Sequence, residues 1–248
     1  MQEPSPQVQS PAFRQVDAGR GVQWWSAGWQ LLFQKGAAGV WIGMYLIAFV
    51  IGLVLHFVPL VGSIAGQIGM FIFAGGLMLA ARKTDQGSIP TVGDLFSGFG
   101  PPLGSLVLGA VLVLVGSLLV FAALTMAGIS AFFGGLVAIA SGRPGAIVGL
   151  GATSLLLVAV GLLLLVPLSM AWWLAPALIV FRQQPPFEAL KTSLAACWAN
   201  LGALAVCGLL GIGFAIIATI PFGLGWLVLG PLAVLMTYAA YRDLFESQ

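Results

Sequence analysis

Residues 36–81 read GAAGVWIGMYLIAFVIGLVLHFVPLVGSIAGQIGMFIFAGGLMLAA and contain no Asp, Glu, Lys or Arg. A helix needs about 20 apolar residues to cross the hydrocarbon core of a bilayer. The stretch is therefore long enough for two crossings, and Pro59 and Gly62 between them favour a tight turn. We expect two spans here, at about 38–58 and 62–81.

The rest of the chain has the same character. The 248 residues are 60% apolar and 6% charged, with a mean hydropathy of +1.09. Soluble domains carry about a quarter charged residues. The composition therefore predicts an all-α polytopic membrane helix bundle, and it excludes a nucleic-acid-binding protein, a soluble enzyme and a disulfide-stapled secreted module.

Three further runs without Asp, Glu, Lys or Arg cover residues 95–142, 144–181 and 192–241. They predict four more spans, at about 103–125, 150–176, 201–220 and 225–241. The last two spans are separated by a turn at Pro221 and Gly225. Residues 126–142 are apolar but short and interrupted by glycine, so an outer loop, a re-entrant segment and a seventh span all stay open for them.

The positions of the cations favour six spans over seven. Cytoplasmic loops carry an excess of Lys and Arg. Six spans leave Arg143 alone on the outer side and put the other eight cations on the inner side: Arg14, Arg20, Lys35, Arg82, Lys83, Arg182, Lys191 and Arg242. Seven spans would divide them six to three. We therefore expect both termini in the cytoplasm, with residues 1–19 as a disordered cytoplasmic tail and residues 20–248 as a single six-helix transmembrane domain.

Short amphipathic segments precede the first, third and fifth spans. Trp25, Trp29, Leu32 and Phe33 share one face of a helix by their spacing, which is typical of a helix at the headgroup level. Similar segments lie at 91–99, where Thr91 and Asp94 have capping-box spacing, and at 186–198. The pattern predicts an internal repeat: three membrane hairpins, each preceded by a short amphipathic in-plane helix.

Three polar residues on the outer half are candidates for contact with a solute or between helices. His56 lies near the outer end of the first span, where it is either an interface group or a proton relay. Gln67 could face it across the hairpin, in an interhelical hydrogen bond or a solute contact. Arg143 either anchors the outer loop at the lipid phosphates or attracts an anionic ligand. Pro59, Gly62, Pro221 and Gly225 are assigned to structural turns.

The sequence contains no recognisable catalytic set. All Asp and Glu residues are expected on the side opposite His56, and no zinc, phosphate or dinucleotide motif is present. Cys197 and Cys207 are too far apart on one helix to form a disulfide or a CxxC site. We therefore predict no catalytic, cofactor-binding or metal-binding residues, no cofactor and no enzymatic activity.

Two classes of function remain. The first is a non-enzymatic envelope protein that acts by contact with the lipid bilayer, a membrane-protein partner or a second copy, with no nucleic acid partner. The alternative is a carrier or channel for a small neutral or amphipathic solute. A carrier would use Pro167 and Pro176 to break the fourth span, and it would have a polar cavity lined by residues such as Ser169, Thr153 or Gln67.

Several segments carry a resemblance: Gly19-Arg20-Gly21 followed by Trp25 and Gly28-Trp29, then 94–99, and 241–245 (YRDLF) at the end. They resemble a family of six-span integral inner-membrane proteins of bacteria, mainly proteobacteria. The resemblance implies a multi-pass location in the bacterial inner membrane, and the family has no known activity from which site residues could be taken. More distantly, the helix-plus-hairpin pattern is similar to the membrane region of bacterial glycerophosphoryl diester phosphodiesterases. Nothing in these residues is like the soluble, metal-dependent catalytic domain of those enzymes.

Overall fold

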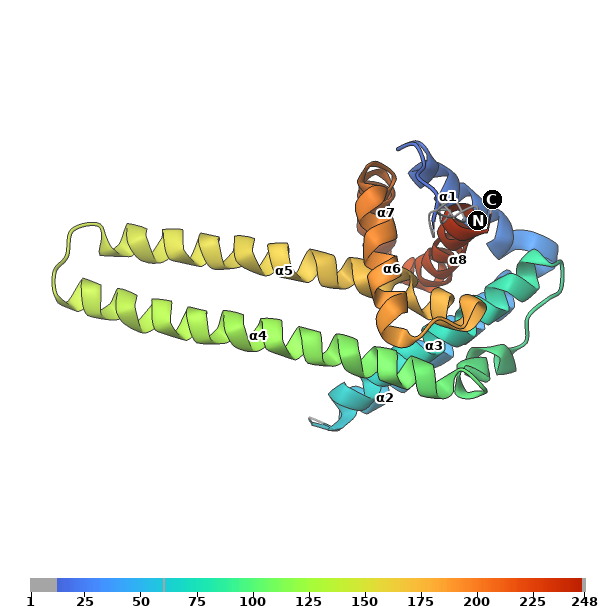
Figure 1. Ribbon diagram of the computed structural model, residues 1–248, viewed down its shortest axis with the longest axis horizontal. Helices are drawn as coiled ribbons and strands as arrows, with labels where there is room; N and C mark the ends of the chain where they lie inside the picture. The colour runs from blue at the N-terminus through green and yellow to red at the C-terminus, as the bar shows by residue number, and fades with distance from the viewer. Residues whose placement is uncertain (1–12, 60, 247–248) are drawn as a thin grey trace, which may run out of the picture. The chain divides into compact units, whose positions relative to one another are not determined.

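The computed structural model describes residues 13–59 and 61–246, and all regular secondary structure in these residues is helical (Figure 1). In chain order the elements are α1 (Arg20–Phe33), η1 (Gln34–Gly36), α2 (Ala38–His56), α3 (Val61–Asp85), η2 (Val92–Phe99), α4 (Leu103–Ala140), α5 (Ala146–Arg182), α6 (Pro186–Ala199), α7 (Leu201–Thr219) and α8 (Trp226–Phe245). The all-α prediction is confirmed. Short helices α1, η2 and α6 also lie at the three places predicted for amphipathic segments.

Five of the described helices are long and apolar enough to cross a membrane: α2, α3, α4, α5 and α7. This set fits a multi-pass membrane protein. Helix α8 is 20 residues long and is not in this set. It contains Pro231, and its last turn carries the charged residues Arg242 and Asp243. The sixth span therefore stays a prediction, as does the arrangement in three hairpins.

The chain forms two compact units. The α1/α7/α8 unit consists of the described residues up to Leu46, together with Leu77–Asp94 and residues 195–246. The α4/α5 unit consists of Ile47–Gly76 and Leu95–Leu194.

In the α1/α7/α8 unit, α1 packs closely along α7 and α8 because two glycines leave room for their backbones. A Cβ atom on Gly28 would lie 2.8 Å from the backbone nitrogen of Met236, and one on Gly21 would collide with the carbonyl oxygen of Ala203. Small residues allow helix axes to approach in this way. Trp25 is buried beside α7, and its Nε1 donates to the carbonyl of Cys207 at 3.0 Å.

The predicted apolar face of α1 is divided between two environments. Trp25 and Leu32 are buried, whereas Trp29 and Phe33 are 52% and 51% exposed, with ring centroids 4.7 Å apart. The face predicted from the spacing therefore has two buried and two exposed side chains. The apolar arc of α1 is wide enough to face protein on one edge and the surroundings on the other.

In the α4/α5 unit, α4 and α5 run side by side as an antiparallel pair (Figure 1). A Cβ atom on Gly135 would lie 2.7 Å from Cδ1 of Leu150, and one on Gly161 would lie 3.3 Å from Cδ1 of Leu124. Helix α4 has 38 residues, which at 1.5 Å per residue is about 57 Å, nearly twice the hydrocarbon core of a bilayer.

The length of α4 bears on the alternatives left open for residues 126–142. Residues 126–140 continue α4 and do not start a separate helix, and the chain turns at residues 141–145. Glycine lowers helix propensity by about 1 kcal/mol relative to Ala. Here it also lets α5 pack closely, as at Gly135, so the glycines do not end the helix.

Two helix connections repeat the same local geometry. Gly62 stands in the first turn of α3, and a Cβ atom there would collide with the carbonyl of Leu55, seven positions earlier. Gly225 precedes α8, and a Cβ atom there would collide with the backbone of Ala218, also seven positions earlier. Pro59 and Pro221 lie in these two connections, so the four residues assigned to turns occupy turns or the helix starts beside them.

Candidate functional site

The residues predicted for solute contact are not brought together by hydrogen bonds. His56 ends α2, Gln67 lies on α3, and Arg143 lies in the turn between α4 and α5; all three are exposed. None of these side chains makes a hydrogen bond or ion pair to another described residue. Their predicted roles stay untested, and the polar side chains that do gather lie in the α1/α7/α8 unit.

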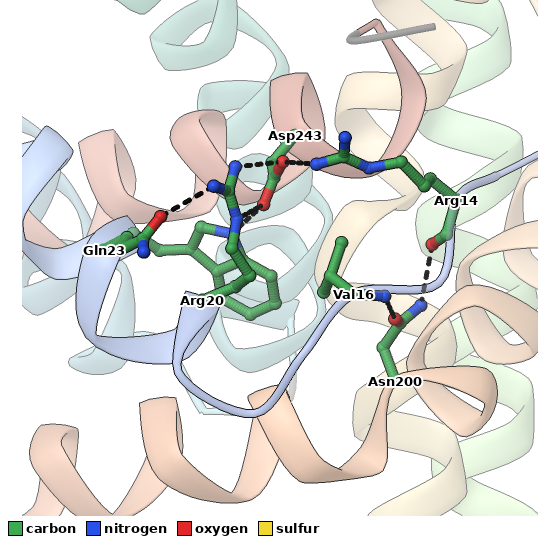
Figure 2. A network of polar contacts seen from close by, with 7 residues as sticks. Arg14, Val16, Arg20, Gln23, Asn200 and Asp243 are labelled. Carbon is green, nitrogen blue, oxygen red and sulfur yellow. Dashed lines mark hydrogen bonds and ion pairs between the residues drawn. The ribbon is translucent and has the colours of Figure 1, made fainter.

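That gathering is centred on Asp243, in the last turn of α8 (Figure 2). Its side chain is 5% exposed and accepts a bond from Nε of Arg20 at 2.7 Å and from Nε1 of Trp24 at 2.9 Å. It also forms ion pairs with the guanidinium groups of Arg14 and Arg20. Arg20 and Trp24 are four residues apart on α1, so both reach the same carboxylate from one helix face.

The segment before α1 is held against the same unit. The backbone N–H of Arg14 donates to the carbonyl of Leu244 at 2.8 Å. Asn200 accepts from the backbone N–H of Val16 at 2.7 Å and donates to the carbonyl of Arg14 at 3.1 Å (Figure 2). The prediction of a disordered tail is therefore wrong for residues 13–19, while residues 1–12 lie outside the described residues.

The surroundings of Asp243 keep it ionised. Burial by itself would raise the pKa of its carboxyl group. The hydrogen bonds from Arg20 and Trp24 and the charges of Arg20 and Arg14 outweigh that effect and lower the pKa below its ordinary value. Asp243 is thus a fixed negative charge on which three side chains converge.

A second group of paired charges lies next to the one around Asp243. Asp85, the last residue of α3, accepts from the hydroxyl of Tyr238 at 3.1 Å and pairs with Arg242. Glu246 pairs with Arg82. The C-terminal ends of α3 and α8 are therefore joined by charged groups of both signs.

Five of the charged groups line a cleft of about 700 Å³ within the α1/α7/α8 unit, which we call the polar groove: Arg20, Asp85, Arg242, Asp243 and Glu246. One wall is a stripe at helical spacing, made by Arg20, Gln23, Ala27 and Gln30 of α1 and by Gln34 at the start of η1. The other wall is made by Ala239, Arg242 and Asp243 of α8, by Glu246 directly after it, and by Asp85 at the end of α3. Trp24 and Leu31 complete the lining. The volume lies within the range of small-molecule sites.

A third face of α1 lies beside the groove stripe. Val22, Trp29 and Phe33 are each about half exposed. At 100° per residue, the arc that they define ends at Phe33, about 60° from Gln30, a member of the groove stripe. One helix thus carries a protein-packed face, a groove face and an exposed apolar stripe.

The chemistry of the polar groove suits binding better than proton transfer. Its carboxylates at Asp85, Asp243 and Glu246 each pair with an arginine. A general base must instead be able to take up a proton at the working pH, whereas a carboxylate paired with an arginine can accept a further hydrogen bond without doing so. In the part of the chain that the structure describes, no three His, Cys, Asp or Glu residues are grouped to hold a metal ion.

Sequence reasoning missed the polar groove, although part of its signal was present. The polar positions of α1 recur at helical spacing, and the resemblance had already selected Arg20 and the segment 241–245. The pairing of Arg20 with Asp243, however, joins residues 223 positions apart.

Comparison with known proteins gives one informative similarity. Over 264 aligned positions, covering 94% of each chain, the sequence is 30% identical to a probable inner membrane protein of Burkholderia thailandensis. No family model matches the sequence, and no solved structure is significantly similar to it.

Proposed function

Since the chain belongs to the family of this probable inner membrane protein, we propose that it is a multi-pass inner-membrane protein without enzymatic activity that acts in the cell envelope through contact with lipid or with a membrane partner. The proposal combines the apolar helices with a polar groove whose charged groups are paired rather than poised for catalysis. The distant similarity of the helix-plus-hairpin pattern to the membrane region of glycerophosphoryl diester phosphodiesterases stays a hypothesis.

The contacts of Asp85 support six spans with both termini in the cytoplasm. Asp85 ends α3, and it contacts Tyr238 and Arg242 near the end of α8. An even number of crossings must therefore separate these two helix ends. Helices α4, α5 and α7 are long and apolar enough to supply three, and the even number is reached if α8 is the fourth crossing in that interval and the sixth in the chain. The cation bias favours the cytoplasm for this end.

The observation that carries the lipid contact is the exposed stripe of α1. Val22, Trp29 and Phe33 lie next to a groove of charged and amide side chains. A helix with apolar and aromatic residues beside polar ones is typical of the boundary between headgroups and acyl chains. We propose that α1 lies at the cytoplasmic boundary and that its stripe contacts lipid.

The carrier alternative draws less support from the structure. Helix α5 continues through Pro167 and Pro176 without a break. The hydroxyl groups of Thr153 and Ser169 donate to the carbonyls of Gly149 and Val166 in their own helix, at 2.9 and 2.7 Å. Neither hydroxyl needs a solute as a hydrogen-bond partner.

The test is purification of the full-length protein in native lipid nanodiscs, followed by mass spectrometry of co-purifying lipids, proteins and small molecules. We expect retained lipid or a stoichiometric membrane protein. If lipid is retained, it should decrease when Trp29 and Phe33 are both replaced by Gln. The matched control is Phe187→Gln, at a residue 60% exposed on α6. Retention of a polar small molecule with no lipid or protein would contradict the proposal and favour a carrier.

A further inference from the structure

We propose that the polar groove binds the headgroup of a phospholipid that carries both a phosphodiester and a primary ammonium, as ethanolamine phospholipids do, with an acyl chain along the exposed stripe of α1. The inference rests on the proposed lipid contact and specifies which lipid that contact selects. It is argued from the charges, the unused hydrogen-bonding capacity and the shape of the groove.

The groove presents both signs of charge side by side. Arg242 is 48% exposed at its side chain and, within the described residues, donates one side-chain hydrogen bond, to Asp85. A guanidinium has five N–H donors, so most of its donors remain for an incoming phosphate. Arginine also matches the geometry of phosphate oxygens.

Acceptors for an ammonium lie close to those donors. Glu246 follows the last residue of α8, four positions after Arg242; its side chain is 35% exposed and pairs with Arg82. Asp85 is 26% exposed and takes bonds from Tyr238 and Arg242. A carboxylate offers about four lone-pair sites, so each retains capacity for another donor. A ligand with an anion and a hydrogen-bonding cation can use both sets together.

The wall formed by α1 fits the rest of such a lipid. Gln30 and Gln34 offer neutral amides in the groove, which can donate to ester oxygens or accept from hydroxyls. The stripe of Val22, Trp29 and Phe33 begins about one sixth of a helical turn beyond Gln30. A headgroup in the groove therefore puts its glycerol near the amides and an acyl chain on the aromatic rings.

The same features exclude other common headgroups. A glycerol headgroup has a phosphate but no cation for Asp85 and Glu246. A choline headgroup has a quaternary ammonium without N–H donors, and it leaves those acceptors without a hydrogen bond. Selectivity should therefore follow the order ethanolamine, then choline and glycerol.

The experiment uses the full chain in nanodiscs made from equal amounts of ethanolamine, choline and glycerol phospholipids with identical acyl chains. Native mass spectrometry then counts the lipids that stay bound to the protein after it is released from the nanodisc. We expect the ethanolamine lipid to be retained about tenfold over the other two, the ratio that one hydrogen bond to a charged group supports. Arg242→Gln and Glu246→Gln should each remove most of this preference, and Lys191→Gln, an exposed change on α6, should keep it.

A competition experiment with a water-soluble compound tests whether the groove binds a lipid or a free phosphoethanolamine compound. Glycerophosphoethanolamine has the same headgroup without acyl chains, and we expect it not to displace the bound lipid at millimolar concentration. Displacement would mean that the site serves a soluble phosphoethanolamine compound and would overturn the lipid assignment. Circular dichroism and elution volume show whether each variant is folded. Gln30→Leu gives a second test of lipid binding in the groove, because it removes a lining amide without altering an ion pair.

The outcomes separate this inference from the proposed function. Equal retention of the three lipids, or a preference unchanged in both Arg242→Gln and Glu246→Gln, would overturn the headgroup assignment and leave lipid contact intact. Loss of all bound lipid from the unaltered protein, with no membrane partner retained, would overturn both.

Discussion

Replacing Asp243 by Asn should separate the charge of this side chain from its shape. Asn keeps an oxygen that can accept from Trp24, but it loses the ion pairs with Arg14 and Arg20. A hydrogen bond to a charged group contributes about 1.5–3 kcal/mol. Because the two arginines are 40% and 36% exposed, solvent screens part of each pair, and we expect a net loss of about 2 kcal/mol in the free energy of unfolding.

Replacing Asp243 by Ala should cost more than replacing it by Asn. Trp24 is 2% exposed, and its indole N–H would then lose its bond to the Asp243 carboxylate. Loss of a hydrogen bond to a charged group costs a further 1.5–3 kcal/mol or so, which brings the expected loss to about 4 kcal/mol.

The assay is reversible unfolding in mixed micelles with a rising fraction of sodium dodecyl sulfate, followed by tryptophan fluorescence and circular dichroism. Glu188→Gln is the matched control, because its ion pair with Lys191 is exposed on both sides and should contribute little. If Asp243→Asn and Asp243→Ala are both as stable as the control, the view that this carboxylate holds α1 on α8 is refuted.

Three further predictions follow from the same unit. Gly28→Ala should lower the free energy of unfolding by about 1–3 kcal/mol because its Cβ meets the α8 backbone, while Gly39→Ala, with open space around it, should have no such effect; micelle unfolding of both variants checks this. The lowered pKa of Asp243 means that its contribution to stability is fully present above the ordinary carboxyl pKa of about 4 and is lost as the pH falls through the lower folded-state value. Hydrogen exchange of α1 should therefore be steady from pH 8 to about 5, after correction for intrinsic rates, and should accelerate below about 4; a profile identical to that of Asp243→Asn would contradict this. Trp25→Phe should cost about 1 kcal/mol through loss of the bond to the Cys207 carbonyl, and a cost no larger than that of Trp29→Phe would show that this bond contributes nothing.

Sequence reasoning located the helices because the cost of burying charge acts locally along the chain. The charge-free run at 36–81 corresponds to α2 and α3, and the segment beginning at Arg20 corresponds to α1. Half of the capping pattern of Thr91 and Asp94 is present as well: the Asp94 carboxylate accepts the backbone N–H of Thr91 at 2.6 Å, while the Thr91 hydroxyl donates to the same carboxylate. Each of these features depends on neighbours within a few turns.

The features that sequence reasoning missed depend on distant partners. Nothing local distinguishes Arg20 as the partner of Asp243, since several arginines and carboxylates were expected on the same side of the membrane. The sequence around residues 13–19 is polar, which led to the prediction of disorder. The structure shows that Asn200, far away in the sequence, hydrogen-bonds the backbone of this segment. The continuation of α4 through Gly135 similarly becomes understandable only with Leu150 packed against it.

The central claim is that α8 crosses the membrane as the sixth span, so that the polar groove faces the cytoplasm. The most direct measurement is the sidedness of the two chain ends, by fusing reporters active only in the cytoplasm or only in the periplasm to each terminus of the full-length protein. The account predicts cytoplasmic reporter activity at both ends. Termini in opposite compartments would mean an odd number of crossings and would contradict it, because the ends of α3 and α8 could then not meet as Asp85 and Arg242 do.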